Sequence, residues 1–123
     1  MNVIVAIDSL KGSLSSLQAG AAAKAGILRA IPAATVSIKP VADGGEGTVT
    51  ALVSGLSGES VTIPVTGPLG ETVEATYGIL PDHTAVIEMA EAAGLPLVPA
   101  EKRNPMNTTT YGVGEMILHA LDE

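Results

Sequence analysis

The stretch VIVAIDSLKGS at residues 3–13 joins a continuous apolar run to a polar turn, and it decides the class of fold. An unbroken apolar run is typical of a strand buried on both faces, as in a parallel sheet. A helix is then predicted, with Ser15 and Gln18 as its capping box and Pro32 at its end. A second strand is predicted at residues 35–38. The chain therefore opens with a strand–helix–strand unit whose two strands run parallel.

A second polar turn, ADGGEG at residues 42–47, follows the second predicted strand and precedes a helix predicted at about residues 46–54. Both turns leave the carboxyl ends of parallel strands, which meet at one edge of the sheet. Ligands of open α/β sheets bind at that edge. We therefore expect Asp8, Lys11 and Ser13 to face the same crevice as Asp43 and Glu46.

The middle of the chain has a different pattern, because apolar and polar residues alternate over residues 61–65 and 73–79 on either side of a turn at 67–70. Alternation of this kind predicts a half-exposed β-hairpin. A third strand is predicted at residues 85–88 and a last helix at 110–121. The predicted fold class is α/β, a parallel βαβ start with Rossmann- or flavodoxin-like layers and an inserted antiparallel hairpin subdomain. We assign residues 1–57 and 95–123 to parts of one α/β domain, and residues 58–94 to the antiparallel insertion.

Composition narrows the choice of partners and location. The chain has 123 residues, is 46% hydrophobic and carries a formal net charge of −7, with only six lysines and arginines. These values favour a single packed domain and argue against nucleic acid and anionic membranes as partners. The chain has no cysteine, which excludes disulfides and thiolate chemistry and makes a reducing cytoplasm the expected location. Neither a signal peptide nor a membrane span is expected.

The two turns carry the residue types that phosphate chemistry uses. Lys11 can hold a phosphate or stabilise transferred charge, and Ser13 can help to cradle an anion, although a helix cap and a solvated lysine explain them equally well. Gly44 and Gly45 allow close approach of the backbone to a ligand, and Asp43 can act as a general base or bind Mg²⁺. The alternative is a tight strand-to-helix turn in which Asp43 caps the helix. The spacing of a Walker A loop is absent.

Other polar residues give weaker signals. Arg103 can make a bidentate contact to a carboxylate or phosphate, and one threonine of residues 108–110 is expected to cap the last helix while another reaches a ligand. Glu88, close to Glu91, is expected to be solvated at a helix start, although a contact in the cleft is the alternative. The two histidines, His83 and His119, are expected at the surface.

Four motifs in order resemble the signatures of bacterial type I glycerate kinases. They are DSLKGS at residues 8–13, ADGGEG at 42–47, VTGPLG at 65–70, and RNP at 103–105 with TTTYG at 108–112. The resemblance covers the chain from Asn2 onward and departs mildly at Leu10, where the family usually has Phe. It implies an ATP- and Mg²⁺-dependent kinase that phosphorylates D-glycerate on a two-domain α/β fold. Family members are much longer, so the chain resembles their amino-terminal part.

The resemblance also implies roles for particular residues, in which a D-glycerate hydroxyl attacks the γ-phosphorus of ATP. The expected catalytic residues are Asp8, Lys11 as a stabiliser of charge, and Asp43 as a base or metal-linked carboxylate. The expected substrate-binding residues are Ser13, Gly44, Gly45, Glu46, Thr109, and Arg103 for the substrate carboxylate. The metal ligands are left unassigned. The alternative is a non-catalytic α/β module that folds or dimerises without turnover, with an exposed sheet edge as the surface for a homodimer.

Overall fold

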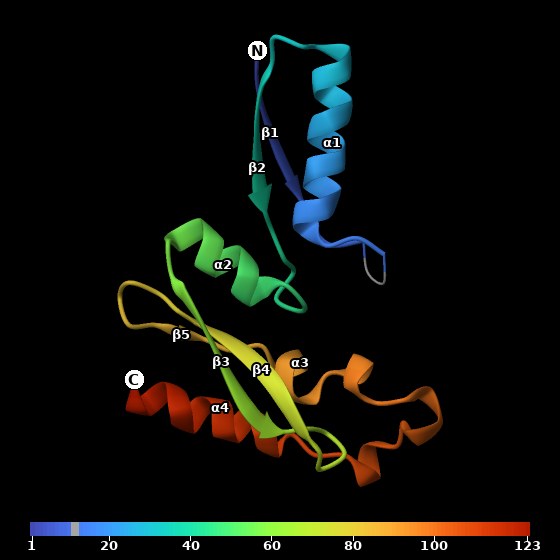
Figure 1. Cartoon of the computed structure of the whole chain (residues 1–123), viewed down its shortest axis with the longest axis vertical. Coiled ribbons are helices and arrows are strands. Elements are labelled where there is room, and N and C mark those ends of the chain that lie inside the picture. Colours follow the sequence, from blue (N-terminus) through green and yellow to red (C-terminus); the bar gives the residue numbers. More distant parts are fainter. Residues whose placement is uncertain (11–12) are drawn as a thin grey trace.

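The computed structural model describes residues 1–10 and 13–123 (Figure 1). A parallel unit is formed by β1 (Asn2–Ile7), α1 (Ser16–Ala30) and β2 (Thr35–Pro40). An antiparallel unit follows, made of β3 (Glu59–Thr66), β4 (Thr72–Ile79), β5 (Ala85–Val86), α3 (Met89–Ala93) and α4 (Tyr111–Asp122). Between the two units lies α2 (Thr48–Leu56), and three short 3₁₀ turns, Leu95–Leu97, Ala100–Lys102 and Pro105–Asn107, lead into α4.

The parallel unit confirms the predicted strand–helix–strand start. Asn2 pairs with Thr35 and Ile7 with Pro40 in a parallel register. The capping box of α1 is present, because the Ser15 hydroxyl accepts a hydrogen bond from the Gln18 N–H at 3.2 Å and Gln18 Oε1 accepts from the Ser15 N–H at 2.9 Å. The expected burial of β1 on both faces is wrong for this chain: α1 packs on the unit, but Ile4 is 71% exposed on β1.

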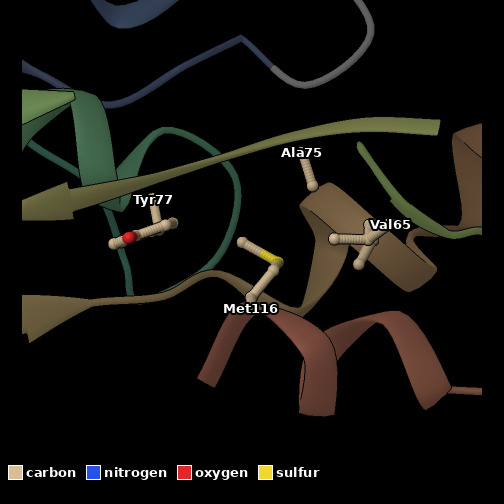
Figure 2. Packing of buried hydrophobic residues seen from close by; sticks show 5 residues of the cluster. Val65, Ala75, Tyr77 and Met116 are labelled. Carbon is tan, nitrogen blue, oxygen red and sulfur yellow. The ribbon is translucent and has the colours of Figure 1, made fainter. Parts of the chain in front are cut away.

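The antiparallel unit contains the main hydrophobic core. β3 and β4 form the predicted hairpin, with Glu59 opposite Ile79 and Thr66 opposite Thr72, and β5 is shorter than expected. Side chains from β3, β4, α3 and α4 meet in one buried cluster (Figure 2), made of Val65, Ala75, Tyr77, Ala92 and Met116. The fold class is confirmed as mixed α/β, with a parallel pair of strands and an antiparallel sheet of three.

The two faces of the antiparallel sheet are covered by different helices. Neighbouring residues of a strand point to opposite faces. The hydroxyl of Tyr77 reaches His119 of α4, whereas Gly78 faces Val53 of α2. A β-carbon at Gly78 would lie 2.5 Å from Val53 Cγ2, so this glycine permits the close approach of α2. The green α2 and the red α4 accordingly lie on either side of β3 and β4 in Figure 1.

The domain division expected from the sequence stays a prediction. Within this chain, however, the segment 95–123 is packed with the antiparallel sheet, because α4 contacts β3 and contributes Met116 to the core cluster. The second predicted helix also begins later than expected, at Thr48 rather than near residue 46. Gly47 has a left-handed backbone (φ +91°), which ends the turn and delays the first helical residue.

Candidate functional site

The first turn (residues 8–13) leaves the end of β1, and the structure describes part of it. Asp8 Oδ1 accepts a hydrogen bond from the Ser9 N–H at 2.6 Å, and the Ser13 N–H donates to the Leu10 carbonyl at 2.8 Å. The expected charge-stabilising residue, Lys11, lies outside the described residues, as does Gly12. What the described part contributes is a half-buried carboxylate at Asp8 and an exposed Ser13, both at the carboxyl edge of the parallel sheet.

Ser16 links the strand ends that lead into the first turn and into the second turn (residues 42–47). Its hydroxyl donates to the Ile7 carbonyl at 2.6 Å and accepts from the Val41 N–H at 3.3 Å. One side chain in the first turn of α1 thus holds the ends of β1 and β2 together. This role of Ser16 was not predicted from the sequence, because a serine near a helix start is commonly a cap, and here Ser15 is the cap residue.

The second turn is held by internal hydrogen bonds. Asp43 Oδ1 accepts from the Gly45 N–H at 3.1 Å, and the Thr48 hydroxyl donates to the Gly45 carbonyl at 2.7 Å. Gly44 and Gly47 have φ values of +98° and +91°, a region that side chains disfavour. The alternative in which Asp43 caps the next helix is not observed, since Gly47 is the cap residue of α2 and makes no side-chain cap hydrogen bond.

Glu88 provides the carboxylate at the start of α2. It is only 8% exposed, and its Oε1 accepts hydrogen bonds from the Thr48 N–H and, at 3.2 Å, from the Val49 N–H. The expectation of a solvated Glu88 is therefore wrong. The reason is a long-range contact: β5 pairs with β4 beneath α2 and brings Glu88 to the helix start. These two N–H groups are consequently not available to a phosphate. The sequence contained one signal for this contact. Gly47, just before α2, has no side chain to cap the helix, so the first N–H groups of α2 needed a hydrogen-bond acceptor from elsewhere in the chain.

The two turns share a small cavity, and of the residues predicted to face one crevice, Ser13 and Glu46 line it. Ser9, Ser13, Ser15 and Glu46 line a hollow of about 200 Å³, so residues from both turns share one crevice. The hydroxyl oxygen of Ser9 is buried there and has no hydrogen-bond partner among the described residues. Asp8, Asp43, Gly44 and Gly45 lie in the same two turns but do not line this hollow. The motif that contains Ser9 was recognised from the sequence, but Ser9 was not predicted to be a site residue.

Two of the other predicted substrate-binding residues, Arg103 and Thr109, line a second cavity of about 490 Å³. Its lining includes apolar Met89 and Leu95 together with Arg103, Asn104 and Thr109. Arg103 Nε donates to the Val98 carbonyl at 3.2 Å, which fixes one edge of the guanidinium. The structure therefore brings Arg103 and Thr109 together, but in a different cavity from Ser13 and Glu46.

Thr109 helps to begin α4. Its hydroxyl accepts from the Tyr111 N–H at 3.1 Å, and its own N–H donates to the Pro68 carbonyl at 3.0 Å. Thr110 occupies the cap position of α4 without a side-chain cap bond. One threonine therefore serves the helix start, as expected, and the Pro68 contact ties the segment to the hairpin turn at residues 67–70. Through Thr109, two of the four motifs are in direct contact.

His119 has a structural partner. Its Nδ1 lies 2.8 Å from the Tyr77 hydroxyl, with the two rings edge to face at 5.9 Å between centroids. The expectation of a surface His119 is wrong, since it is half-buried against the core, whereas His83 is exposed in a turn as expected. Burial, and secondarily the negative charge of Glu123, raise the pKa of Tyr77 above its ordinary 10.0.

Among residues 1–10 and 13–123, no helix is both long and apolar enough to cross a membrane, and no cluster of three acidic or histidine side chains could bind a metal.

Comparison with known proteins places the chain in a family. The model of the glycerate kinase family matches residues 3–123. The chain is 54% identical over 123 residues to the glycerate kinase of Bacillus subtilis (strain 168), covering 99% of this chain and 32% of the relative. It is 50% identical over 123 residues to the glycerate 2-kinase of Escherichia coli (strain K12), covering 99% of this chain and 32% of that protein.

A solved structure agrees with these relatives. A crystal structure of a proposed glycerate kinase 2 from Salmonella typhimurium LT2 superposes with a TM-score of 0.78 at 48% identity, over 99% of this chain and 33% of that one. The chain thus spans about a third of the length of the proteins it matches. With a family match over residues 3–123 and identities near one half, the chain belongs to the glycerate kinase family.

Proposed function

We propose that this chain forms part of a glycerate kinase that transfers the γ-phosphoryl group of ATP to a hydroxyl of D-glycerate. The observation that supports it most is the meeting of two of the family-like motifs at one crevice, where Ser13 of the first turn and Glu46 of the second line the same hollow. Ser16 holds the strands that carry these turns at a fixed separation. Phosphoryl transfer depends on such positioning more than on covalent chemistry.

In this proposal the second turn performs the proton and metal chemistry. Asp43 and Glu46 are exposed carboxylates in one turn, a donor set that fits Mg²⁺, which is usually held by one or two carboxylates together with substrate phosphates. Asp43 accepts the proton of the attacking hydroxyl or holds the metal, and Gly44 offers its N–H group to the substrate. Gly45, whose N–H is bonded to Asp43 Oδ1, contributes close backbone contact with the substrate. Asp8 and Lys11 complete the catalytic set at the first turn, with Lys11 countering the charge on the transferred group.

Binding of the substrate carboxylate is assigned to Arg103, with Thr109 beside it. Arg103 is the cation in the larger cavity, and its Nε contact to Val98 leaves the terminal nitrogens of the guanidinium to face a ligand. Because the cavity of Arg103 is separate from that of Ser13 and Glu46, domain closure must bring the two together in the complete site. ATP supplies the phosphoryl group, and we assign no nucleotide-binding residue to this segment. A cytoplasmic location belongs to the same proposal.

A chimera tests this function. The chain replaces the matching third of the Bacillus subtilis glycerate kinase, and ADP release is followed with D-glycerate and Mg²⁺-ATP. We expect a kcat/KM within about tenfold of the parent enzyme, and a loss of about 100-fold or more on Asp43→Asn. The 123-residue chain alone is the matched comparison and is expected to give no turnover. A folded chimera without activity, beside an active parent, would remove the proposal.

A second function is favoured by the exposed parallel unit. A sheet of two strands is marginal by itself, and Ile4 of β1 is 71% exposed. These features favour the hypothesis that the isolated chain forms a dimer through the open edge of its parallel sheet and has no turnover. Sedimentation velocity of the chain over a range of concentrations separates the readings. A monomer at every concentration would contradict dimerisation through this edge, and Ile4→Lys is expected to weaken any dimer that forms.

A further inference from the structure

We propose that Glu88 is a positioning residue that fixes the second turn, and with it Asp43, in the geometry the reaction needs. The inference rests on the proposed kinase function. Glu88 is the one buried charged residue in the described part of the chain, at 8% exposure. A buried carboxylate is costly unless its oxygens accept hydrogen bonds, so its partners define its purpose.

The partners of Glu88 lead to Asp43 through a short series of hydrogen bonds. Glu88 Oε1 accepts from the N–H groups of Thr48 and Val49. The Thr48 hydroxyl donates to the Gly45 carbonyl at 2.7 Å, and the Gly45 N–H donates to Asp43 Oδ1 at 3.1 Å. Each link joins a residue to the next, so displacement of the start of α2 displaces Gly45 and the carboxylate bonded to it.

Among the residues that the structure describes, no other side chain caps the start of α2. Its cap residue is Gly47, which has none to offer, and the first turn of α2 contains no acidic residue. The first N–H groups of a helix lack partners within the helix and carry partial positive charge. A carboxylate from elsewhere in the chain therefore supplies what the local sequence of residues 43–49 does not.

Glu88 is itself held in place by the antiparallel sheet. Two residues before it, Val86 pairs with Gly78, the same glycine that permits α2 to pack closely on β4. The next residue, Met89, begins α3 and lines the cavity that contains Arg103 and Thr109. Glu88 is thus hydrogen-bonded to the helix start that follows the second turn, and it is adjacent in sequence to Met89 in the lining of the Arg103 cavity.

The chain offers matched controls for a purely structural role. Glu91 Oε2 accepts from the Thr76 N–H at 3.0 Å, and Glu115 Oε2 accepts from the Thr66 N–H at 2.6 Å. These are also carboxylates bonded to backbone N–H groups, but their partners lie on β4 and β3 rather than at the second turn. Substitution by Gln removes the charge and keeps an acceptor oxygen in all three. A loss of amide protection or of kcat that occurs in Glu88→Gln but not in the two control variants is therefore caused by the second turn.

The first measurement is amide hydrogen exchange on the 123-residue chain. Glu88→Gln is expected to accelerate exchange at Thr48 and Val49 and in the second turn by about tenfold, with little change at Thr66 and Thr76. Glu91→Gln is expected to accelerate exchange at Thr76 while leaving the second turn unchanged. Equal exchange at the second turn in Glu88→Gln and the unsubstituted chain would overturn the proposal.

The second measurement uses steady-state kinetics of the chimera described above. Glu88→Gln is expected to lower kcat by about 10- to 100-fold while KM for ATP changes less than about twofold, because misplacement of a catalytic group slows the reaction without removing binding contacts. Glu91→Gln and Glu115→Gln are expected to keep kcat within about twofold. A kcat loss for Glu88→Gln no larger than theirs would overturn the proposal. If the unsubstituted chimera is inactive, the kinase function fails, and the exchange comparison alone decides whether Glu88 fixes the turn.

Discussion

Two glycines of α4, placed two residues apart, are expected to respond in opposite directions to the same substitution. Gly112 lies where α4 meets β3, and a β-carbon there would approach the Thr66 carbonyl oxygen far more closely than the 3.0 Å that real β-carbons keep. At Gly114 the same β-carbon would meet no atom of residues 1–10 or 13–123 within 4 Å. Both positions are helical, so alanine gains helix propensity at each, by about 1 kcal/mol. The difference between the two variants isolates the helix–strand contact.

The magnitude follows from what has to move. The obstructing atom at Gly112 belongs to the backbone of β3, so no side-chain rotation relieves the clash, and α4 must shift away from the sheet. Such a shift disturbs Met116, which is fully buried in the core cluster. Overpacking of this kind costs up to about 3 kcal/mol, which leaves a net loss of about 2 kcal/mol after the gain in propensity. Gly114→Ala is expected to stabilise the chain by about 0.5–1 kcal/mol.

Urea denaturation followed by circular dichroism measures both changes. With a slope of about 1.5 kcal/mol/M, Gly112→Ala should lower the unfolding midpoint by about 1.3 M and Gly114→Ala should raise it by about 0.5 M. The slopes themselves should stay equal to that of the unsubstituted chain. Midpoints that move in the same direction, or a Gly112→Ala chain as stable as the parent, would refute the close packing of α4 on β3.

Three further outcomes follow from the described hydrogen bonds. Ser16→Ala should lower the free energy of unfolding by about 1–2 kcal/mol, because it leaves the Ile7 carbonyl and the Val41 N–H without their shared partner. Thermal denaturation measures the change, and an unchanged midpoint would contradict this role of Ser16. Ser9→Ala, which removes a buried hydroxyl without a partner among the described residues, should change stability by less than about 0.5 kcal/mol, and a loss as large as that of Ser16→Ala would be inconsistent with this account. Tyr77→Phe should cost about 1 kcal/mol at neutral pH through the lost bond to His119. The raised pKa of Tyr77 means that the folded state favours the neutral phenol. The resulting contribution to the free energy of unfolding is present below pH 10.0 and is lost as the pH rises through the pKa of the folded state. Between pH 9 and pH 11, the urea midpoint should therefore fall less in Tyr77→Phe than in the unsubstituted chain.

The features predicted correctly from the sequence are those determined by neighbouring residues. The capping box of Ser15 and Gln18, the end of α1 before Pro32 and the hairpin around residues 67–70 all depend on contacts within a few positions. The meeting of Ser13 and Glu46 was also predicted, because it follows from the rule that parallel strands share a carboxyl edge. Local pattern and the geometry of the βαβ unit were sufficient for these features.

The features that were missed depend on residues far apart in the chain. Glu88 finds its partners 39 and 40 positions earlier, and His119 finds Tyr77 42 positions earlier. Nothing near Glu88 in the sequence distinguishes it from a solvated acid, since its burial depends on the short strand β5 passing beneath α2. The packing of α4 on β3 is equally non-local. Periodicity identifies a helix and its apolar face, but the surface that receives this face is determined by topology.

The inward-facing carboxylates change how the negative charge of the chain should be interpreted. The chain carries 13 aspartates and glutamates, yet Glu88, Glu91 and Glu115 each accept a hydrogen bond from a backbone N–H of another element. Part of the acidity therefore serves the packing of helices on strands and does not face a ligand. Because Glu88 already accepts hydrogen bonds from the start of α2, the proposed kinase function assigns the carboxylate of an anionic substrate to Arg103 rather than to this helix start. Exchanging Arg103 for Lys, which keeps the charge but loses the paired donors, is then expected to raise KM for D-glycerate in the chimera by about tenfold with little effect on KM for ATP. An equal rise in both values would show that Arg103 does not bind the substrate carboxylate.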